Sequence, residues 1–281
     1  MFFLSAVSIF IFFLFSWVLR NFFIDYNEFF YWPYAFYYLM ALYGGIVGLY
    51  ISTKWGGWKT AVGRSIIIFS LALLGQVFGQ VYYSIMFEFI GNETPYPIGE
   101  IGFLSSVVLY AFGAFSLAKI AGGKISINGV FNKIALITIP VVLYLFAYLL
   151  FIREVELDFT VITFDSVTAI LSIIYPLVHA TFISVTLLAY LLSRKVLGGQ
   201  LKTTILFLLI ALFVHYFAES FYLYQNRHGL YEAGGTSDLG FLIAYFTMTM
   251  GLIQFNSVLN KLKGKSSQTN NSTQQPEVTV Q

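Results

Sequence analysis

Two ionisable residues stand one helical turn apart within a long apolar stretch of the sequence, His215 and Glu219. A helix would place both side chains on one face, about 6 Å apart along its axis. In low-dielectric surroundings, an imidazole beside a carboxylate can bind a proton or a cation. We therefore take this pair as the first candidate for a functional site.

A further histidine and three carboxylates extend the set of candidates. His179 falls near the middle of the preceding apolar segment, at the same expected depth as His215. Glu100, Asp165 and Asp238 stand where apolar segments begin. A carboxylate there accepts backbone N–H bonds and complements the helix dipole. Helix capping is therefore the simpler interpretation for these three, and an outward-facing ion or ligand site is the alternative.

Three interpretations remain open for the group formed by His179, His215 and Glu219. The first is a buried hydrogen-bonded network that joins helices, with about 1 kcal/mol per bond. The second is a proton- or cation-responsive site in which the groups titrate as one coupled unit. The third is metal or haem ligation by the two histidines, with Glu219 as a further ligand. The remaining histidine, His228, falls in a loop, so we expect no bound cofactor.

The composition is that of a membrane protein. Of the 281 residues, 58% are hydrophobic and only 10% are charged, with a mean hydropathy of +0.79. Soluble domains of this size do not have such a composition, so we predict an all-α, multi-pass protein of the plasma membrane. Nucleotide-binding loops, Ser-His-Asp sets and paired-acid hydrolase motifs are absent, and basic clusters only flank the apolar segments. We therefore expect neither an enzyme nor a partner of nucleic acids.

Eight apolar stretches reach the roughly 20 residues that a transmembrane helix needs. The first has no positive residue before its apolar run and no cleavage site after it, so we expect a retained helix. The eight stretches are approximately Phe2 to Leu19, Pro33 to Thr53, Ser65 to Phe87, Glu100 to Ile120, Ile134 to Phe151, Val167 to Ser193, Thr203 to Tyr224, and Asp238 to Leu259.

Lysine and arginine residues are concentrated in every second connection between the apolar stretches. Twelve of these fifteen residues lie in every second connection or after the last stretch, and eleven of the thirteen acidic residues lie in the other connections. Because Lys and Arg accumulate on the cytoplasmic side, both termini are predicted to be cytoplasmic. Glu219 is then the single carboxylate within an apolar stretch. An outer connection also carries a glycosylation acceptor pattern at Asn92.

The sequence contains an internal repeat, which predicts two parallel four-helix units over residues 1–125 and 126–260. A polar tail without apolar periodicity follows over residues 261–281, and we expect it to be disordered and cytoplasmic. The matches are Gln76, Phe78, Gln80 and Tyr83 with His215, Phe217, Glu219 and Tyr222 at an offset of 139, and Glu100, Gly102, Phe103, Leu104 and Gly113 with Asp238, Gly240, Phe241, Leu242 and Gly251 at an offset of 138.

The two copies differ in chemistry at the positions of the first candidate pair. Where the second unit has His215 and Glu219, the first has Gln76 and Gln80. Amides form hydrogen bonds but do not titrate at neutral pH. Any role that needs ionisation or strong metal ligation therefore belongs to the second unit.

Several short motifs occur along the second unit, with a partial copy in the first. They are Tyr175-Pro176, Ala218-Glu219, Tyr231, Gly234, Asp238 and Tyr245, with a first copy at Pro97, Glu100 and Phe103. These motifs resemble those of a group of eight-helix membrane modules, which occur as archaeal membrane proteins and as N-terminal sensory regions of diguanylate cyclases and histidine kinases. The resemblance implies a sensory or accessory module. This sequence departs from the pattern at His179, where an acidic residue is usual, and at Glu219 and Glu100, where Asp is more typical.

The leading hypothesis is thus a non-enzymatic membrane module, embedded in the lipid bilayer, that acts on a protein partner in the same membrane. A proton- or cation-coupled transporter or channel is the main alternative, because an embedded carboxylate and parallel repeats also suit a carrier. The third class is a haem- or metal-binding membrane redox protein that uses the two histidines of the apolar segments.

Overall fold

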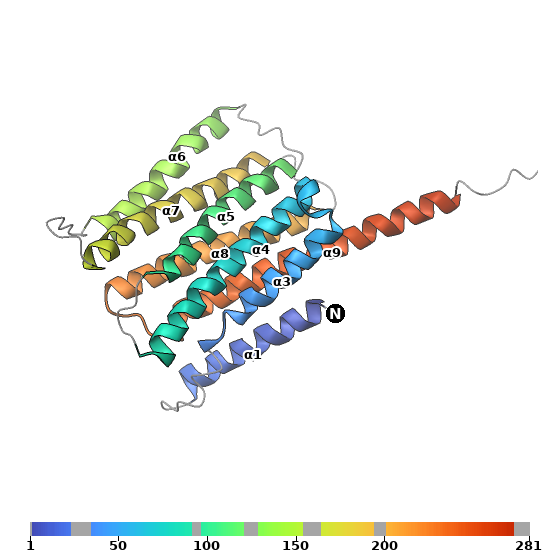
Figure 1. The fold of residues 1–281 in the computed structure, drawn as a ribbon. Helices are drawn as coiled ribbons and strands as arrows, with labels where there is room; N and C mark the ends of the chain where they lie inside the picture. Colours follow the sequence, from blue (N-terminus) through green and yellow to red (C-terminus); the bar gives the residue numbers. More distant parts are fainter. Residues whose placement is uncertain are drawn as a thin grey trace, which may run out of the picture.

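The computed structural model describes residues 2–23, 35–91, 97–120, 129–153, 164–193 and 201–272. These residues are helical and contain no strand, as predicted (Figure 1). A 3₁₀ turn, η1 (Gly57–Lys59), precedes α4, and two π-helical turns, η2 (Ile85–Phe89) and η3 (Tyr148–Ile152), extend α4 and α6. The α-helices are α1 (Phe2–Phe22), α3 (Leu39–Lys54), α4 (Ala61–Ser84), α5 (Gly99–Ile120), α6 (Val130–Ala147), α7 (Phe164–Ser193), α8 (Lys202–Arg227) and α9 (Thr236–Ser272).

Seven helical segments in the described part of the chain are long and apolar enough to cross a membrane. Their bounds are Phe2–Phe22, Ala61–Phe87, Gly99–Leu117, Val130–Ile152, Ile173–Leu191, Lys202–Arg227 and Thr236–Gly264. The remaining predicted span, Pro33 to Thr53, is described only as the 16 residues of α3. The protein is therefore a helical bundle with the apolar helices of a multi-pass membrane protein.

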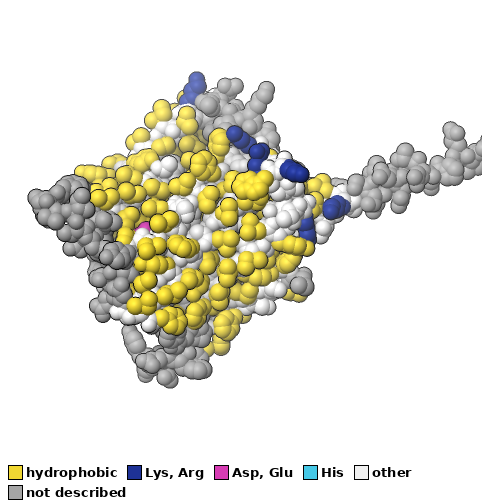
Figure 2. Space-filling view, viewed as in Figure 1, with side chains coloured by type: hydrophobic (Ala, Val, Ile, Leu, Met, Phe, Trp, Pro, Cys, Tyr) yellow, Lys and Arg dark blue, Asp and Glu magenta, His cyan; other side chains and the backbone are white. Residues whose placement is uncertain are grey.

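The surface of the bundle matches this assignment. Hydrophobic side chains cover the face seen in Figure 2, whereas Lys and Arg gather at the end from which α9 projects. Large apolar side chains point outward along α6, including Phe131, Ile134, Ile137 and Val141. Such an apolar exterior suits contact with lipid rather than with water.

The helices pack as two antiparallel hairpins with further helices against them. α4 packs on α5 and α8 packs on α9, while α3 lies against α4 and α9, and α7 lies against α5 and α6. α1 and α6 are the outermost helices, at opposite edges of the bundle (Figure 1). Helices from the first half of the chain therefore contact helices from the second half along the whole centre of the bundle.

Small residues bring the two helices of each hairpin close together. A methyl group at Gly102 of α5 would come within 2.5 Å of the carbonyl oxygen of Gly75 in α4. Gly240 of α9 similarly faces Ala218 of α8, where a methyl group would lie 2.9 Å from the Ala218 Cβ. Membrane helices commonly associate through such small-residue contacts, because dispersion contacts rather than hydrophobic burial drive their packing.

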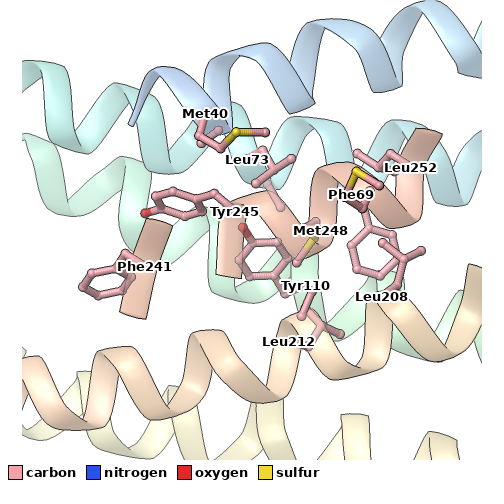
Figure 3. Close-up of a cluster of buried hydrophobic side chains, with 14 of the residues drawn as sticks. Met40, Phe69, Leu73, Tyr110, Leu208, Leu212, Phe241, Tyr245, Met248 and Leu252 are labelled. Carbon is pink, nitrogen blue, oxygen red and sulfur yellow. The ribbon is translucent and has the colours of Figure 1, made fainter. Parts of the chain in front are cut away.

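The buried centre of the bundle is rich in aromatic side chains. Tyr110, Tyr245 and Phe69 are fully buried and lie near Phe241 and Leu212 in Figure 3. They come from α4, α5, α8 and α9, so the same core joins both hairpins. This core surrounds the polar residues that the sequence singles out.

The C-terminal segment differs from the prediction of a disordered tail. α9 continues to Ser272 and projects beyond the bundle (Figure 1), so residues 261–272 are helical. This stretch contains no proline, and its Lys, Gln and Leu residues favour helix, so nothing stops a helix that packing has already nucleated. Residues 273–281 and the predicted glycosylation acceptor Asn92 lie outside the described residues, as does the side chain of Asp165.

Candidate functional site

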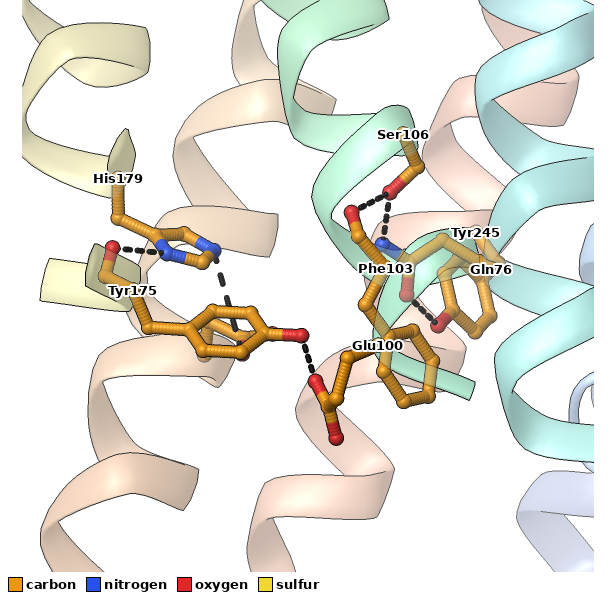
Figure 4. Close-up of polar contacts among 8 residues, drawn as sticks. Gln76, Glu100, Phe103, Ser106, Tyr175, His179 and Tyr245 are labelled. Atoms are coloured by element: carbon orange, nitrogen blue, oxygen red, sulfur yellow. Dashed lines mark hydrogen bonds and ion pairs between the residues drawn. The ribbon is translucent and has the colours of Figure 1, made fainter. Parts of the chain in front are cut away.

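The carboxylate of Glu100 lies in the first turn of α5, where it accepts hydrogen bonds from two tyrosines. The Tyr83 hydroxyl at the end of α4 donates to Oε1 at 2.5 Å. The Tyr175 hydroxyl of α7 donates to Oε2, as Figure 4 shows. Sequence reasoning treated Glu100 mainly as a helix cap. Instead, its two oxygens connect α4, α5 and α7.

His179 follows Tyr175 by one turn of α7 and is 2% exposed. Its Nδ1 is hydrogen-bonded to the backbone oxygen of Tyr175 at 2.8 Å, and the two rings stack with centroids 5.7 Å apart. Nε2 points to the opposite side, 3.9 Å from Oε1 of Glu219, and has no hydrogen-bond partner (Figure 4). The carbonyl bond and the stacked ring therefore aim Nε2 at Glu219.

Glu219 lies on α8 and is 9% exposed. Besides His179, the carboxyl group of Glu100 acts electrostatically on Glu219. The Tyr222 ring, one turn further along α8, is within the field of Glu219, Glu100 and Asp238. Three carboxylates from α5, α8 and α9 thus converge where α4 and α8 end and where α5 and α9 begin.

His215 occupies a different environment from the one the sequence suggested. It is 0% exposed, and neither ring nitrogen has a hydrogen-bond partner. Its ring packs among aromatic side chains, with centroid distances of 5.1 Å to Tyr110, 5.6 Å to Phe241 and 6.1 Å to Tyr245. Although His215 and Glu219 share a helix face, His179 is the histidine whose ring nitrogen faces Glu219.

The two glutamines of the first half form ordinary amide hydrogen bonds. Gln76 donates to the Ser106 hydroxyl and accepts from the Tyr245 hydroxyl at 3.1 Å (Figure 4). Gln80 donates to the Tyr37 hydroxyl at 3.1 Å. Both amides therefore link α4 to a neighbouring helix or segment without a carboxylate or a histidine.

Asp238 organises the loop that precedes α9. It is 4% exposed and accepts the backbone N–H of Gly234 at 2.5 Å. The Tyr37 and Tyr231 hydroxyls donate to its other oxygen at 3.4 and 3.5 Å, and the positive charge of Arg20 attracts it. With these partners, Asp238 has a structural role in closing the loop.

The three candidate metal ligands, His179, His215 and Glu219, occupy different surroundings. Among the residues that the structure describes, no group of three or more His, Asp or Glu side chains is arranged to hold a metal ion. His179 and Glu219 face each other, but the His215 ring lies among aromatic rings. The set that does converge is Glu100, His179 and Glu219, which we call the polar cluster.

Sequence reasoning missed the tyrosines of the polar cluster. Tyr83 and Tyr222 occupy equivalent positions in the repeat, which was the available signal, and both lie beside carboxylates. No known protein family, curated protein or solved structure matches this chain.

Proposed function

We propose that the protein is an eight-helix module of the plasma membrane, of sensory or accessory type, in which the polar cluster receives a signal. The proposal is based on which half of the chain supplies each residue of the polar cluster. Glu100 belongs to the first half of the chain, whereas His179 and Glu219 belong to the second half. A change of charge in the cluster therefore acts on the contact between the halves, and a protein partner in the membrane receives the result.

Equivalent contacts in both halves support the two-unit architecture of residues 1–125 and 126–260. The Tyr83 and Phe103 rings pack with centroids 6.0 Å apart, and their counterparts Tyr222 and Phe241 pack at 6.3 Å. The helix contacts follow the same pattern. α3 of the first unit packs on α9 of the second unit, and α7 of the second unit packs on α5 of the first. A two-fold axis between parallel units predicts such a pair of equivalent contacts.

Two close glycine contacts support the same relation. Gly113 lies against the Phe69 ring, and its counterpart Gly251 lies against Leu208, which is the residue equivalent to Phe69. The same pair of positions therefore sets the spacing of both hairpins.

The charge distribution supports the proposed orientation and the eighth span. Basic residues gather at the end from which α9 leaves, which suits a cytoplasmic location for that end and for both termini (Figure 2). α3 packs between α4 and α9, and its Met40, Ala41 and Ile51 side chains are fully buried. We infer that α3 and the residues before it complete the eighth crossing.

The continuity of the helices favours a module over a carrier. Transporters of the repeat type build their sites from discontinuous helices that line a cavity. Here α8 runs without a break past Glu219, and α7 continues through Pro176 and past His179 to Ser193. Glycine contacts close the α4–α5 interface. The polar cluster is thus suited to altering how two packed halves fit together.

A distance measurement between the halves tests this proposal. The chain has no cysteine, so cysteines at the exposed Lys59 and Lys133 accept spin labels selectively. In lipid nanodiscs, the distance between labels is expected to change when H⁺, Na⁺ or K⁺ is varied, and the change is expected to be lost in Glu219→Gln. His228→Gln removes an exposed histidine and serves as the matched control. A distance that never changes would refute the signal-receiving role.

A further inference from the structure

The hydrogen bond at Nδ1 determines which nitrogen of His179 carries a proton. A carbonyl oxygen only accepts hydrogen bonds, so the 2.8 Å contact with the Tyr175 oxygen requires Nδ1 to be the donor. In a neutral imidazole, the other nitrogen is then an unprotonated acceptor. That nitrogen, Nε2, is the atom that faces Glu219.

An ionised Glu219 would place two acceptors opposite each other. An ionised carboxylate has no proton to donate, and neither has Nε2 of the neutral ring. The two atoms are 3.9 Å apart in a buried site, and Nε2 has no other partner. Burial without a donor is costly for Nε2 of His179. One proton between them removes the conflict, either as a carboxylic acid that donates to Nε2 or as an imidazolium that donates to the carboxylate.

Glu100 increases the need for this proton. Both of its oxygens accept hydroxyl hydrogens, from Tyr83 and Tyr175, and these bonds stabilise the ionised form of Glu100. Its negative charge acts directly on Glu219. A proton on the Glu219–His179 pair lowers the charge of the polar cluster from two negative charges to one.

The groups around the pair supply no positive charge. No lysine or arginine is among the described groups that act on Glu219 or His179. The titratable groups that surround the pair are Glu100 and Tyr110 on α5, Tyr175 on α7, His215 and Tyr222 on α8, Asp238 and Tyr245 on α9, and Tyr83 on α4. The histidines are therefore the only members of this set that gain a positive charge.

We propose that Glu219 and His179 form a binding site for one proton, and that this proton is the ligand of the polar cluster. H⁺ from water adds to Oε1 of Glu219 or to Nε2 of His179, and no other bond changes. The nearer aqueous side is the end of α8, because Glu219 lies eight residues from Arg227, or about 12 Å along the helix. That the proton acts as a signal rests on the proposed function, whereas its presence at the site does not.

The first half of the chain contains a natural control for this site. Gln80 stands at the position equivalent to Glu219 and donates an amide hydrogen to Tyr37. An amide carries its own donor, so this copy needs no added proton. Glu219→Gln therefore installs a side chain that the same scaffold already holds at the equivalent position.

Spectroscopy of the full-length protein in nanodiscs tests the proposal. Infrared spectra detect a protonated carboxyl group, and ¹⁵N-histidine spectra assign the protons of each ring. At neutral pH we expect either a protonated-carboxyl band that Glu219→Gln removes or an imidazolium signal that His179→Gln removes, with Nδ1 protonated in both cases. Asp238→Asn is the matched control, because Asp238 has its own donors and the signal of the pair is expected to remain.

Two results would overturn the proposal. One is a neutral His179 ring protonated at Nε2 instead of Nδ1. The other is a spectrum with neither a protonated Glu219 nor an imidazolium in a titration down to about pH 5, the lower limit of the usual range for protein stability. If Glu219→Gln fails to fold, loss of the site proton in His179→Gln carries the same test. A proton present at the site together with unchanged spin-label distances would refute the signalling role alone.

Discussion

Replacing Gly102 by alanine is expected to separate α5 from α4 and to break the contact that holds Glu100. The added methyl carbon would lie 2.5 Å from the Gly75 oxygen and 2.9 Å from the Gly79 nitrogen. Both are backbone atoms and cannot rotate away. Ordinary contact begins at 3.4 Å, so the helices must move apart by about 1 Å.

This displacement is large enough to affect the polar cluster. Gly102 lies two residues after Glu100, whose bond with Tyr83 is 2.5 Å long. Adding about 1 Å brings that bond to the limit of hydrogen bonding. Overpacking costs about 1–3 kcal/mol, and loss of a hydrogen bond to a charged group costs about 1.5–3 kcal/mol. Together these two costs amount to about 2.5–6 kcal/mol.

Thermal unfolding in nanodiscs measures this effect. With about 2–4 °C per kcal/mol for chains of roughly this size, the midpoint of unfolding is expected to fall by about 5–24 °C. Gly264→Ala in α9 is the matched control, because nothing lies within 4 Å of a methyl group there. Alanine favours helix over glycine, so the control is expected to be neutral or slightly stabilising. An unchanged midpoint for Gly102→Ala would refute the argument that backbone contact sets the helix spacing.

Three further substitutions test individual contacts by the same unfolding assay. His215→Phe removes two buried nitrogens without partners and is expected to stabilise the protein by about 1–3 kcal/mol; a loss of stability would mean that these nitrogens are hydrogen-bonded. Tyr175→Phe removes one donor from Glu100 and is expected to cost about 1.5–3 kcal/mol; a neutral effect would contradict an ionised Glu100. Trp17→Phe removes the indole bond to the Gly235 oxygen and is expected to cost about 1 kcal/mol and to expose the loop before α9 to proteases; unchanged cleavage would show that α1 does not hold this loop.

The helices could be predicted because membrane spans need long apolar segments, and the sequence has them. The pairing of helices that are distant in sequence could not be predicted. Apolar periodicity is almost uniform around helices such as α5, so it does not indicate that α5 faces α7. For this reason, Glu100 was interpreted mainly as a cap, although Tyr175 of α7 donates to it. The extent of α9 was missed because polar composition was taken as disorder.

The sequence predicts how deep each residue of the candidate site lies in the membrane, and part of the site follows from that depth alone. His179 and Glu219 lie in neighbouring apolar segments, and the structure brings them to 3.9 Å. Depth also suggested His215, but rotation about the helix axis decides which neighbours a side chain meets. That rotation turns the His215 ring towards Tyr110 and Phe241. A spacing of four residues places two side chains on roughly the same face of a helix. It does not show that they touch each other, as His215 and Glu219 illustrate.

The different chemistry of the two halves has a consequence for how the module works. The Gln80 amide holds its neighbour Tyr37 with a hydrogen that it never loses, so this link is independent of pH. At the equivalent position, Glu219 meets Nε2 of His179, and the link between them requires a proton that water can supply or remove. The Gln80–Tyr37 link in the first half therefore stays the same as pH changes, whereas the Glu219–His179 link in the second half depends on pH. Because Glu100 of the first half lies beside Glu219, loss of the proton sets two negative charges against each other across the contact between the halves. Under the proposed function, this repulsion acts where α5 of the first half meets α7 and α8 of the second half, so a change at a single site alters the contact between the halves.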